Sequence, residues 1–172
     1  MKKISVIVPV LNSKEHLNRI IIGLLKQTYT NLEIIIVDTG SSDGTFELSQ
    51  EWSFLDKRIK CCKTCEPVFD YGVRVSNGEY ILFVDNINLD DNTMLESMVK
   101  ALINDNSDIS VYNSNYNKVT NYLVCNEINI INNLDGVLWN KLFKKSLFLN
   151  YKSIDNLFKV ALKKAVRISL FV

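Results

Sequence analysis

The sequence predicts an α/β fold, a three-layer α/β/α sandwich with a mostly parallel central sheet. Short continuous apolar runs, typical of strands that are buried on both faces, alternate with segments that carry apolar residues at helical spacing. Turn-forming polar residues close most of these runs. The 172 residues, 47% of them hydrophobic, supply one core and are too few for two ordinary domains.

The first half of the chain predicts strands and helices in alternation. The β-branched run 4–10 predicts a buried strand. Asn12 and Glu15 have the spacing of a capping box, which predicts that an amphipathic helix begins here and covers 14–27. Later apolar runs predict a strand, a helix and a weaker third strand at 32–37, 46–52 and 58–62.

The rest of the chain is less regular. We expect no helix or strand over 63–77 and a fourth strand over 80–84. After it the pattern predicts a helix over 94–103, a strand over 109–112, strand-rich chain over 123–131 and an amphipathic helix from about 155 to 170.

Charge and cysteine usage exclude several classes. The net charge of +1 conceals an acidic stretch, residues 1–140, with 12 basic and 18 acidic side chains, and a basic end with eight and one. The acidic main part argues against nucleic-acid binding. Four cysteines are too few for a disulfide framework, and Cys62-x-x-Cys65 has no second ligand pair for zinc. No apolar run reaches the roughly 18 residues of a membrane span, and no signal-peptide cleavage site follows the N-terminus, so we expect a cytoplasmic protein.

Polar loops follow three of the predicted strands, at 9–13, 38–45 and 85–88. Ligands of open α/β sheets bind beyond the carboxyl ends of the strands. If the three strands are neighbours, these loops form one wall that carries Asp38, Asp43 and Asp85. For Asp43, which precedes Gly44, a turn or helix cap is an equally good interpretation.

The loops lack the motifs of several nucleotide and catalytic sites. No P-loop and no G-x-G-x-x-G is present, and the first strand is not followed by the acidic pair of a receiver domain. His16 is the single histidine and lies in the first turn of a helix, which argues against a nucleophilic triad. Acidic loops can instead bind a ribose or base edge, or hold a hard cation beside a diphosphate.

Several ordered motifs cover residues 4 to about 158 and comprise Ile4–Asn12, Leu24–Tyr29, Asn31–Asp38, Gly40–Thr45, Gly78–Asp85, Trp139–Phe143 and Asp155–Phe158. Together they strongly resemble glycosyltransferase family 2, the inverting GT-A fold. The resemblance implies transfer of a sugar from a nucleotide-diphosphate donor, expected to be a UDP-sugar, to a glycan or lipid-linked acceptor with inversion. It also implies one domain, 1–172, with a nucleotide-binding half at 1–90 and a shortened acceptor half with a basic C-terminal helix at 91–172.

The same resemblance implies roles for individual residues. Asp155 falls on the general base that deprotonates the acceptor hydroxyl. Asp85 and Asn88 fall on the site of Mn²⁺ or Mg²⁺. The positions expected to contact the nucleotide are Pro9, Asn12, Asp38, Thr39 and Asp85.

The chain departs from the family pattern at informative positions. Ile87 stands where the family has its second metal-binding acid, and Asn88 offers only a neutral amide oxygen. Thr39 replaces a second aspartate, and Phe69-Asp70 stands where the family has an Arg-Asn pair. These departures leave two other hypotheses open, a nucleotide-sugar-binding module without catalysis and a purely structural domain.

Structural interpretations also remain for the later motifs. Asp155 fits a helix N-cap or a surface acid, and Trp139 and Phe143 fit core anchors better than sugar-stacking platforms. In the basic end, Lys159, Lys163 and Arg167 lie four residues apart and form a cationic stripe. This stripe fits peripheral contact with an anionic membrane or, more simply, the solvated face of a packed helix.

Overall fold

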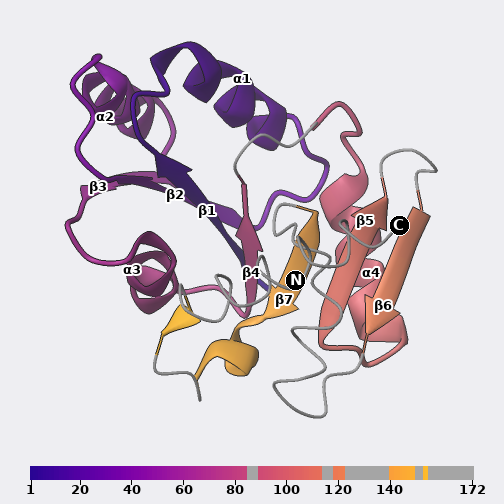
Figure 1. Cartoon of the computed structure of the whole chain (residues 1–172). Coiled ribbons are helices and arrows are strands. Elements are labelled where there is room, and N and C mark those ends of the chain that lie inside the picture. The colour runs from indigo at the N-terminus through magenta and orange to yellow at the C-terminus, as the bar shows by residue number, and fades with distance from the viewer. Residues whose placement is uncertain (85–88, 114–117, 123–139, 150–152, 155–172) are drawn as a thin grey trace, which may run out of the picture.

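The computed structural model describes residues 1–84, 89–113, 118–122, 140–149 and 153–154 of the chain (Figure 1). The elements follow one another in the order β1 (Ile4–Val10), α1 (Lys14–Leu25), β2 (Leu32–Asp38), α2 (Thr45–Leu55), β3 (Ile59–Lys63), α3 (Val68–Val75), β4 (Tyr80–Phe83), α4 (Met94–Asn104), β5 (Ile109–Asn113), β6 (Lys118–Tyr122), β7 (Lys141–Lys144) and the 3₁₀ helix η1 (Lys145–Phe148).

Within the described residues, the strands form one seven-stranded sheet in the order β3-β2-β1-β4-β7-β5-β6. β3, β2, β1 and β4 are parallel, and β7, β5 and β6 continue the sheet through antiparallel pairs. β1 pairs with both β2 and β4, so the strands that precede the three polar loops are neighbours, as the wall hypothesis requires. The predicted α/β fold is confirmed, but the described sheet is mixed and not mostly parallel, because three of its six strand pairs are antiparallel.

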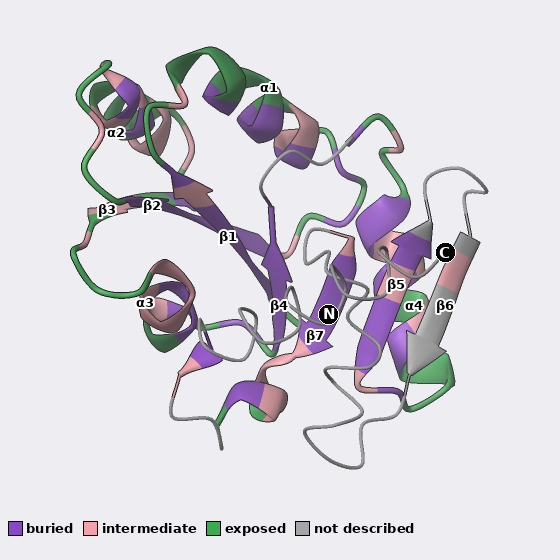
Figure 2. Cartoon of the chain, viewed as in Figure 1, coloured by how far each residue is buried: buried purple, intermediate pink, exposed green. Residues whose placement is uncertain are grey.

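Helices cover both faces of the sheet (Figure 1). α1, α2 and α4 contribute side chains to one hydrophobic cluster, whereas α3 and η1 contribute to a second cluster on the opposite face. The central strands alternate between the two, since Val6 and Val8 belong to the first cluster and Ile7 to the second. Figure 2 shows the result, with β2 and β4 buried throughout and β1 buried except at the partly buried Pro9.

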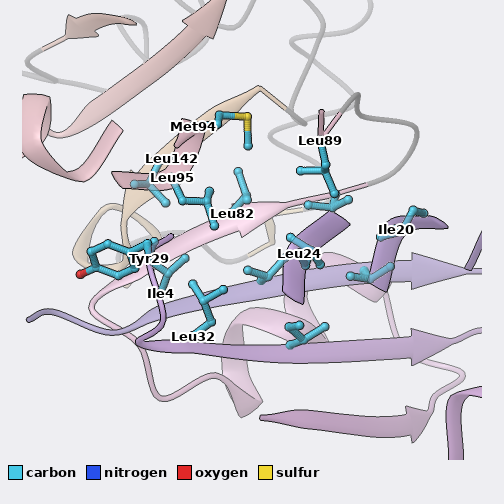
Figure 3. Close-up of a cluster of buried hydrophobic side chains, with 14 of the residues drawn as sticks. Ile4, Ile20, Leu24, Tyr29, Leu32, Leu82, Leu89, Met94, Leu95 and Leu142 are labelled. Carbon is cyan, nitrogen blue, oxygen red and sulfur yellow. The ribbon is translucent and has the colours of Figure 1, made fainter. Parts of the chain in front are cut away.

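The larger cluster joins the parallel and antiparallel halves (Figure 3). Ile4, Leu32 and Leu82 rise from the parallel strands toward Leu24 of α1, and Leu142 of β7 lies in the same layer. Met94 and Leu95 bring the start of α4 against them. The apolar face of the helix predicted over 94–103 is therefore part of the hydrophobic core.

The smaller cluster is aromatic at its centre. Phe83 of β4 makes edge-to-face contacts with Phe69, Phe143 and Phe148, at ring-centroid distances of 5.1, 6.1 and 6.0 Å. Phe143 is fully buried, which favours the core-anchor interpretation of that residue. Ile154 joins this cluster and is 4% exposed.

Two local predictions are wrong. The stretch 63–77 is not wholly irregular, because α3 occupies Val68–Val75 and packs on the second face of the sheet. Asn12 does not cap α1. The N-cap residue is Ser13, and its side chain makes no capping hydrogen bond. Asn12 instead adopts a positive φ of 50° in the loop before it.

No helix in the described part of the chain is long and apolar enough to cross a membrane. The predicted basic helix at 155–170 and the strand-rich chain at 123–131 lie outside the described residues.

Candidate nucleotide-binding site

Hydrogen bonds join the loop after β1 to the loop after β2. The backbone N–H of Asn12 donates to Ser41 Oγ at 2.9 Å, and the side chain of Asn12 accepts from the N–H of Ser42 at 3.0 Å. The N–H of Ser13 donates to Thr45 Oγ1 at 2.8 Å. The two polar loops therefore form one continuous rim at the carboxyl ends of these neighbouring strands.

The conformation of Asn12 suits its place in this rim. Asparagine tolerates a positive φ better than most residues, and here the turn aims its side-chain oxygen at the neighbouring loop. Asn12 is exposed at the rim.

Asp38 ends β2 beneath this rim and is fully buried. Its Oδ1 accepts hydrogen bonds from the backbone N–H groups of Gly40 and Ser41, at 2.7 and 2.9 Å. Its other oxygen, Oδ2, is buried and accepts no hydrogen bond from any described residue. A buried acceptor without a donor is rare and costs about 1–3 kcal/mol. Asp38 is therefore held rigidly through one oxygen, while the other has unused bonding capacity.

The environment of Asp38 keeps its carboxyl ionised. Burial acts to raise the pKa, but the hydrogen bonds from Ser41 and Gly40 and the nearby Lys63 ammonium outweigh it, so the pKa lies below its usual value. Lys63 pairs with Asp38 in the β2–β3 register. An ionised Oδ2 accepts hydrogen bonds and donates none, so this point of the site fits an N–H or O–H donor.

Asp43 has a structural task. Its Oδ1 accepts from the N–H and the hydroxyl of Thr45, at 3.0 and 2.5 Å, and its Oδ2 accepts from the N–H of Lys14 at 3.2 Å. Thr45 and Lys14 are the first residues of α2 and α1. The turn-or-cap interpretation of Asp43 therefore holds, and one carboxylate caps two helices.

The other predicted contacts of the first two loops lie at the same edge. Pro9 is partly buried in β1 and pairs with Val37. Thr39 is exposed, and its backbone N–H donates to Val10 O at 3.1 Å. The structure therefore brings Pro9, Asn12, Asp38 and Thr39 together at the carboxyl ends of β1 and β2.

The remaining residues that the sequence analysis singled out, Asp85, Asn88, Asp155 and Trp139, lie outside the described residues. In the part of the chain that the structure does describe, no group of three or more His, Cys, Asp or Glu side chains is arranged to hold a metal ion. The donors proposed for a cation remain those of the sequence, a carboxylate and an amide without a second acid.

Sequence reasoning missed Ser41 and Asp70. Ser41 bonds both Asp38 and Asn12, and the Asp-x-x-Ser spacing of an Asx-type turn is the signal that points to it. Asp70 accepts hydrogen bonds from Ser153 and Ile154, more than 80 positions away. No local pattern indicates a contact of that range.

The profile of Glycosyl transferase family 2 matches residues 5–169, so the chain belongs to this family. Over 115 residues it is 32% identical to Glycosyltransferase GlyA of Streptococcus pneumoniae, a match that covers 64% of this chain and 16% of that protein.

Solved structures of glycosyltransferases share the fold. Residues 1–349 of S. aureus TarS in complex with UDP match with a TM-score of 0.65 and 21% identity, over 95% of this chain and 54% of that one. The mannosyltransferase PcManGT from Pyrobaculum calidifontis, in complex with GDP-Man and Mn²⁺, matches with a TM-score of 0.63 and 19% identity, over 86% and 46%. The chain thus spans about half of each solved structure and a smaller part of GlyA.

Proposed function

We propose that this chain binds a nucleotide-diphosphate sugar, with a UDP-sugar as the favoured donor, beyond the carboxyl ends of β1 and β2. It would transfer the sugar with inversion to a hydroxyl group of a glycan or lipid-linked acceptor. The observation that carries the proposal is Asp38, whose ionised Oδ2 has no donor among the described residues at the edge where such sheets bind ligands.

Asp38 suits recognition of a base by its N–H edge. Uracil and guanine both present a ring N–H donor, and the TarS and PcManGT structures contain UDP and GDP-Man. A carboxylate that meets such a donor forms a charge-assisted hydrogen bond, which offsets the cost of the buried acceptor. Because Oδ2 is enclosed, binding would be accompanied by a small movement of the loop 39–44.

A divalent cation would neutralise the diphosphate. We assign it to the carboxylate of Asp85 and the amide oxygen of Asn88, by analogy with the family motif and supported by the Mn²⁺ in the PcManGT structure. When bound, the cation stabilises negative charge on the departing nucleoside diphosphate.

Asp155 would act as the general base. In this proposal it removes the proton of the acceptor hydroxyl, whose oxygen attacks the anomeric carbon while the bond from that carbon to the diphosphate oxygen breaks. The products are the inverted glycoside and the nucleoside diphosphate. The glycan or lipid-linked class of acceptor rests on the family resemblance alone.

Calorimetric titration tests the donor site directly. Purified chain is titrated with UDP, GDP and ADP, each with and without an excess of Mn²⁺. We expect UDP to bind best, and Asp38→Asn to weaken UDP binding by about tenfold, because the amide can turn a donor toward the base N–H. The matched control is Asp56→Asn, which changes the same charge at the other end of α2, beside Arg58.

Two results would contradict the proposal. One is the absence of binding to all three nucleotides by a folded chain. The other is an equal loss of UDP affinity in Asp38→Asn and Asp56→Asn. A specific contact to the base cannot depend equally on two carboxylates that lie at opposite ends of the parallel strands.

The second candidate function is a nucleotide-sugar-binding module without transfer activity. Ile87 favours it, because an aliphatic side chain at the second metal-ligand position removes one carboxylate from the cation site. Tight UDP binding that is indifferent to Mn²⁺, together with no UDP release from UDP-sugars, would select this function over the transferase.

The basic end 155–170 would bring the domain to the anionic cytoplasmic face of a membrane. Its stripe of Lys159, Lys163 and Arg167 fits acidic headgroups. Sedimentation with vesicles of phosphatidylglycerol and phosphatidylcholine, against vesicles of phosphatidylcholine alone, tests this part separately from donor binding.

A further inference from the structure

The side chain of Asp70 bridges α3 and a distant part of the chain. Its Oδ2 accepts a hydrogen bond from the hydroxyl of Ser153 at 2.9 Å, and its Oδ1 accepts one from the backbone N–H of Ile154. Each of its two oxygens therefore bonds one of two consecutive residues. In Figure 1 this short segment lies beside α3.

α3 is a fixed support for this contact. Gly72 lies so close to β1 that an added Cβ would meet Ile7 Cγ2 at 2.6 Å. Phe69, next to Asp70, packs edge to face on Phe83 of β4. The helix is thus packed closely on β1, whose carboxyl end borders the candidate donor site, and on β4. A shift of Asp70 together with the helix would disturb these contacts.

The other partner is equally well anchored. Ile154 is 4% exposed and belongs to the hydrophobic cluster that contains Val73 of α3 and Phe148 of η1. Phe148 contacts Phe83 and Phe143 at 6.0 and 5.5 Å between ring centroids. The apolar side chain of Ile154 is buried, and Asp70 satisfies its backbone N–H, so position and orientation are both fixed.

Ile154 is covalently joined to Asp155. We propose that Asp70 is a positioning residue of the transferase reaction, because it fixes the chain immediately before Asp155, the proposed general base. This inference rests on the proposed function, in which Asp155 is that base. A misplacement of about 1 Å is enough to lower a rate about 100-fold, so such a support acts on turnover more than on donor affinity.

A double-mutant cycle on the full chain tests the inference. The assay is UDP release from UDP-glucose, UDP-galactose or UDP-N-acetylglucosamine, with octyl β-glucoside and with water alone as acceptor. Four proteins are compared: the wild type, Asp70→Ala, Asp155→Asn and the double variant. The affinity for UDP and the melting temperature are measured for each, and Glu66→Ala, at an exposed acid near the start of α3, serves as the matched control.

We expect Asp70→Ala to lower kcat about 10- to 100-fold, with the Kd for UDP within about threefold of the wild type. In the Asp155→Asn background the same change should lower kcat by less than about twofold, because a support has no effect once the group it places is gone. Asp70→Asn keeps one acceptor oxygen and should restore part of the rate.

Each contrary result has a distinct meaning. Multiplicative losses in the double variant, or an unchanged kcat in folded Asp70→Ala, would overturn the role of Asp70 while the transferase function stands. A wild-type chain that binds UDP and releases none from any donor would overturn the transferase function, and the role of Asp70 with it. If Asp70→Ala does not fold, Ser153→Ala removes one of the two bonds and enters the same cycle.

Discussion

The carboxylate of Asp43 accepts a hydrogen bond from the backbone N–H of Lys14, 29 positions earlier in the chain, at 3.2 Å. The same carboxylate accepts from Thr45, the first residue of α2. A single side chain therefore accepts from one backbone N–H group at the start of each of two helices that cover one face of the sheet. Since α1 and α2 begin at the candidate donor site, Asp43 helps to set their mutual position and the shape of the rim, together with the bonds of Asn12 and Ser13.

Replacement of Asp43 should affect both stability and binding. We expect Asp43→Ala to lower the melting temperature by several degrees and to weaken UDP binding, because the two loops lose their shared acceptor. Asp43→Asn keeps an acceptor oxygen and should retain most of both. Thermal unfolding and calorimetry check this, and a full-affinity Asp43→Ala protein would show that the rim does not need this link.

Glu33 gives the fold a defined response to acid. Its side chain is 4% exposed, and it accepts hydrogen bonds from Ser5, Lys60 and Asn77. Burial acts to raise the pKa, but these bonds outweigh it and lower the pKa from 4.5 to about 2. A lowered pKa in the folded state means that the stabilisation is complete above about pH 4.5 and is lost as the pH falls toward 2.

Glu33→Gln should therefore cost about 2–3 kcal/mol of unfolding free energy at pH 7. The difference between the two proteins should shrink on going from pH 5 to pH 3, since the wild-type carboxylate loses its advantage there. Urea unfolding at the two pH values measures this difference. A difference in unfolding free energy that is the same at pH 5 and pH 3 would mean that ionisation of Glu33 does not stabilise the fold.

Long periodic patterns made the main elements predictable. α1 and α4 begin at Lys14 and Met94, the residues at which the sequence predicts them, and β1 has the predicted bounds. Their apolar faces are wide and continuous, so burial and local pattern agree. That β1, β2 and β4 are neighbours was only a condition of the wall hypothesis, and the observed sheet order meets it.

Elements that depend on distant contacts were not predictable. α3 is eight residues long and contains Gly72 together with the poor helix former Val73, and it is placed by close contact of Gly72 with Ile7. β7 is four residues long, and its pairing with β4 and β5 defines it.

In the candidate site, too, some features could be predicted from the sequence and others depend on the folded chain. The type and place of Asp38 could be predicted, whereas its unequal oxygens depend on the loop conformation that brings Gly40 and Ser41 to one of them. The positive φ of 119° at Gly40 is part of that conformation. The bond between Asp70 and Ser153 joins residues 83 positions apart, a range that no local pattern indicates.

Gly78 marks a place where the backbone leaves no room for a side chain. An added Cβ would lie 2.6 Å from the backbone nitrogen of Ser5 and 2.8 Å from the carbonyl oxygen of Lys3. We expect Gly78→Ala to lower the unfolding free energy by about 2 kcal/mol, because main-chain atoms of a central strand cannot move aside. Glu79→Ala, an exposed neighbour paired only with Lys2 in the described salt bridges, should cost less than about 1 kcal/mol. Equal costs in urea unfolding would contradict the steric account.

Ile87 offers a gain-of-function test of the metal hypothesis. In the family motif this position carries an acid, so Ile87→Asp should add a charged oxygen ligand and raise the Mn²⁺-dependent part of UDP affinity by about tenfold. Ile87→Asn adds only a neutral amide oxygen and should give a smaller gain, which makes it the matched control. Calorimetry with Mn²⁺ and with EDTA separates the metal-dependent part from direct nucleotide binding. A restored carboxylate attracts the cation only if Asp85 also binds it. UDP binding by Ile87→Asp that does not respond to Mn²⁺ would therefore contradict a cation site at this motif and favour the binding-module function.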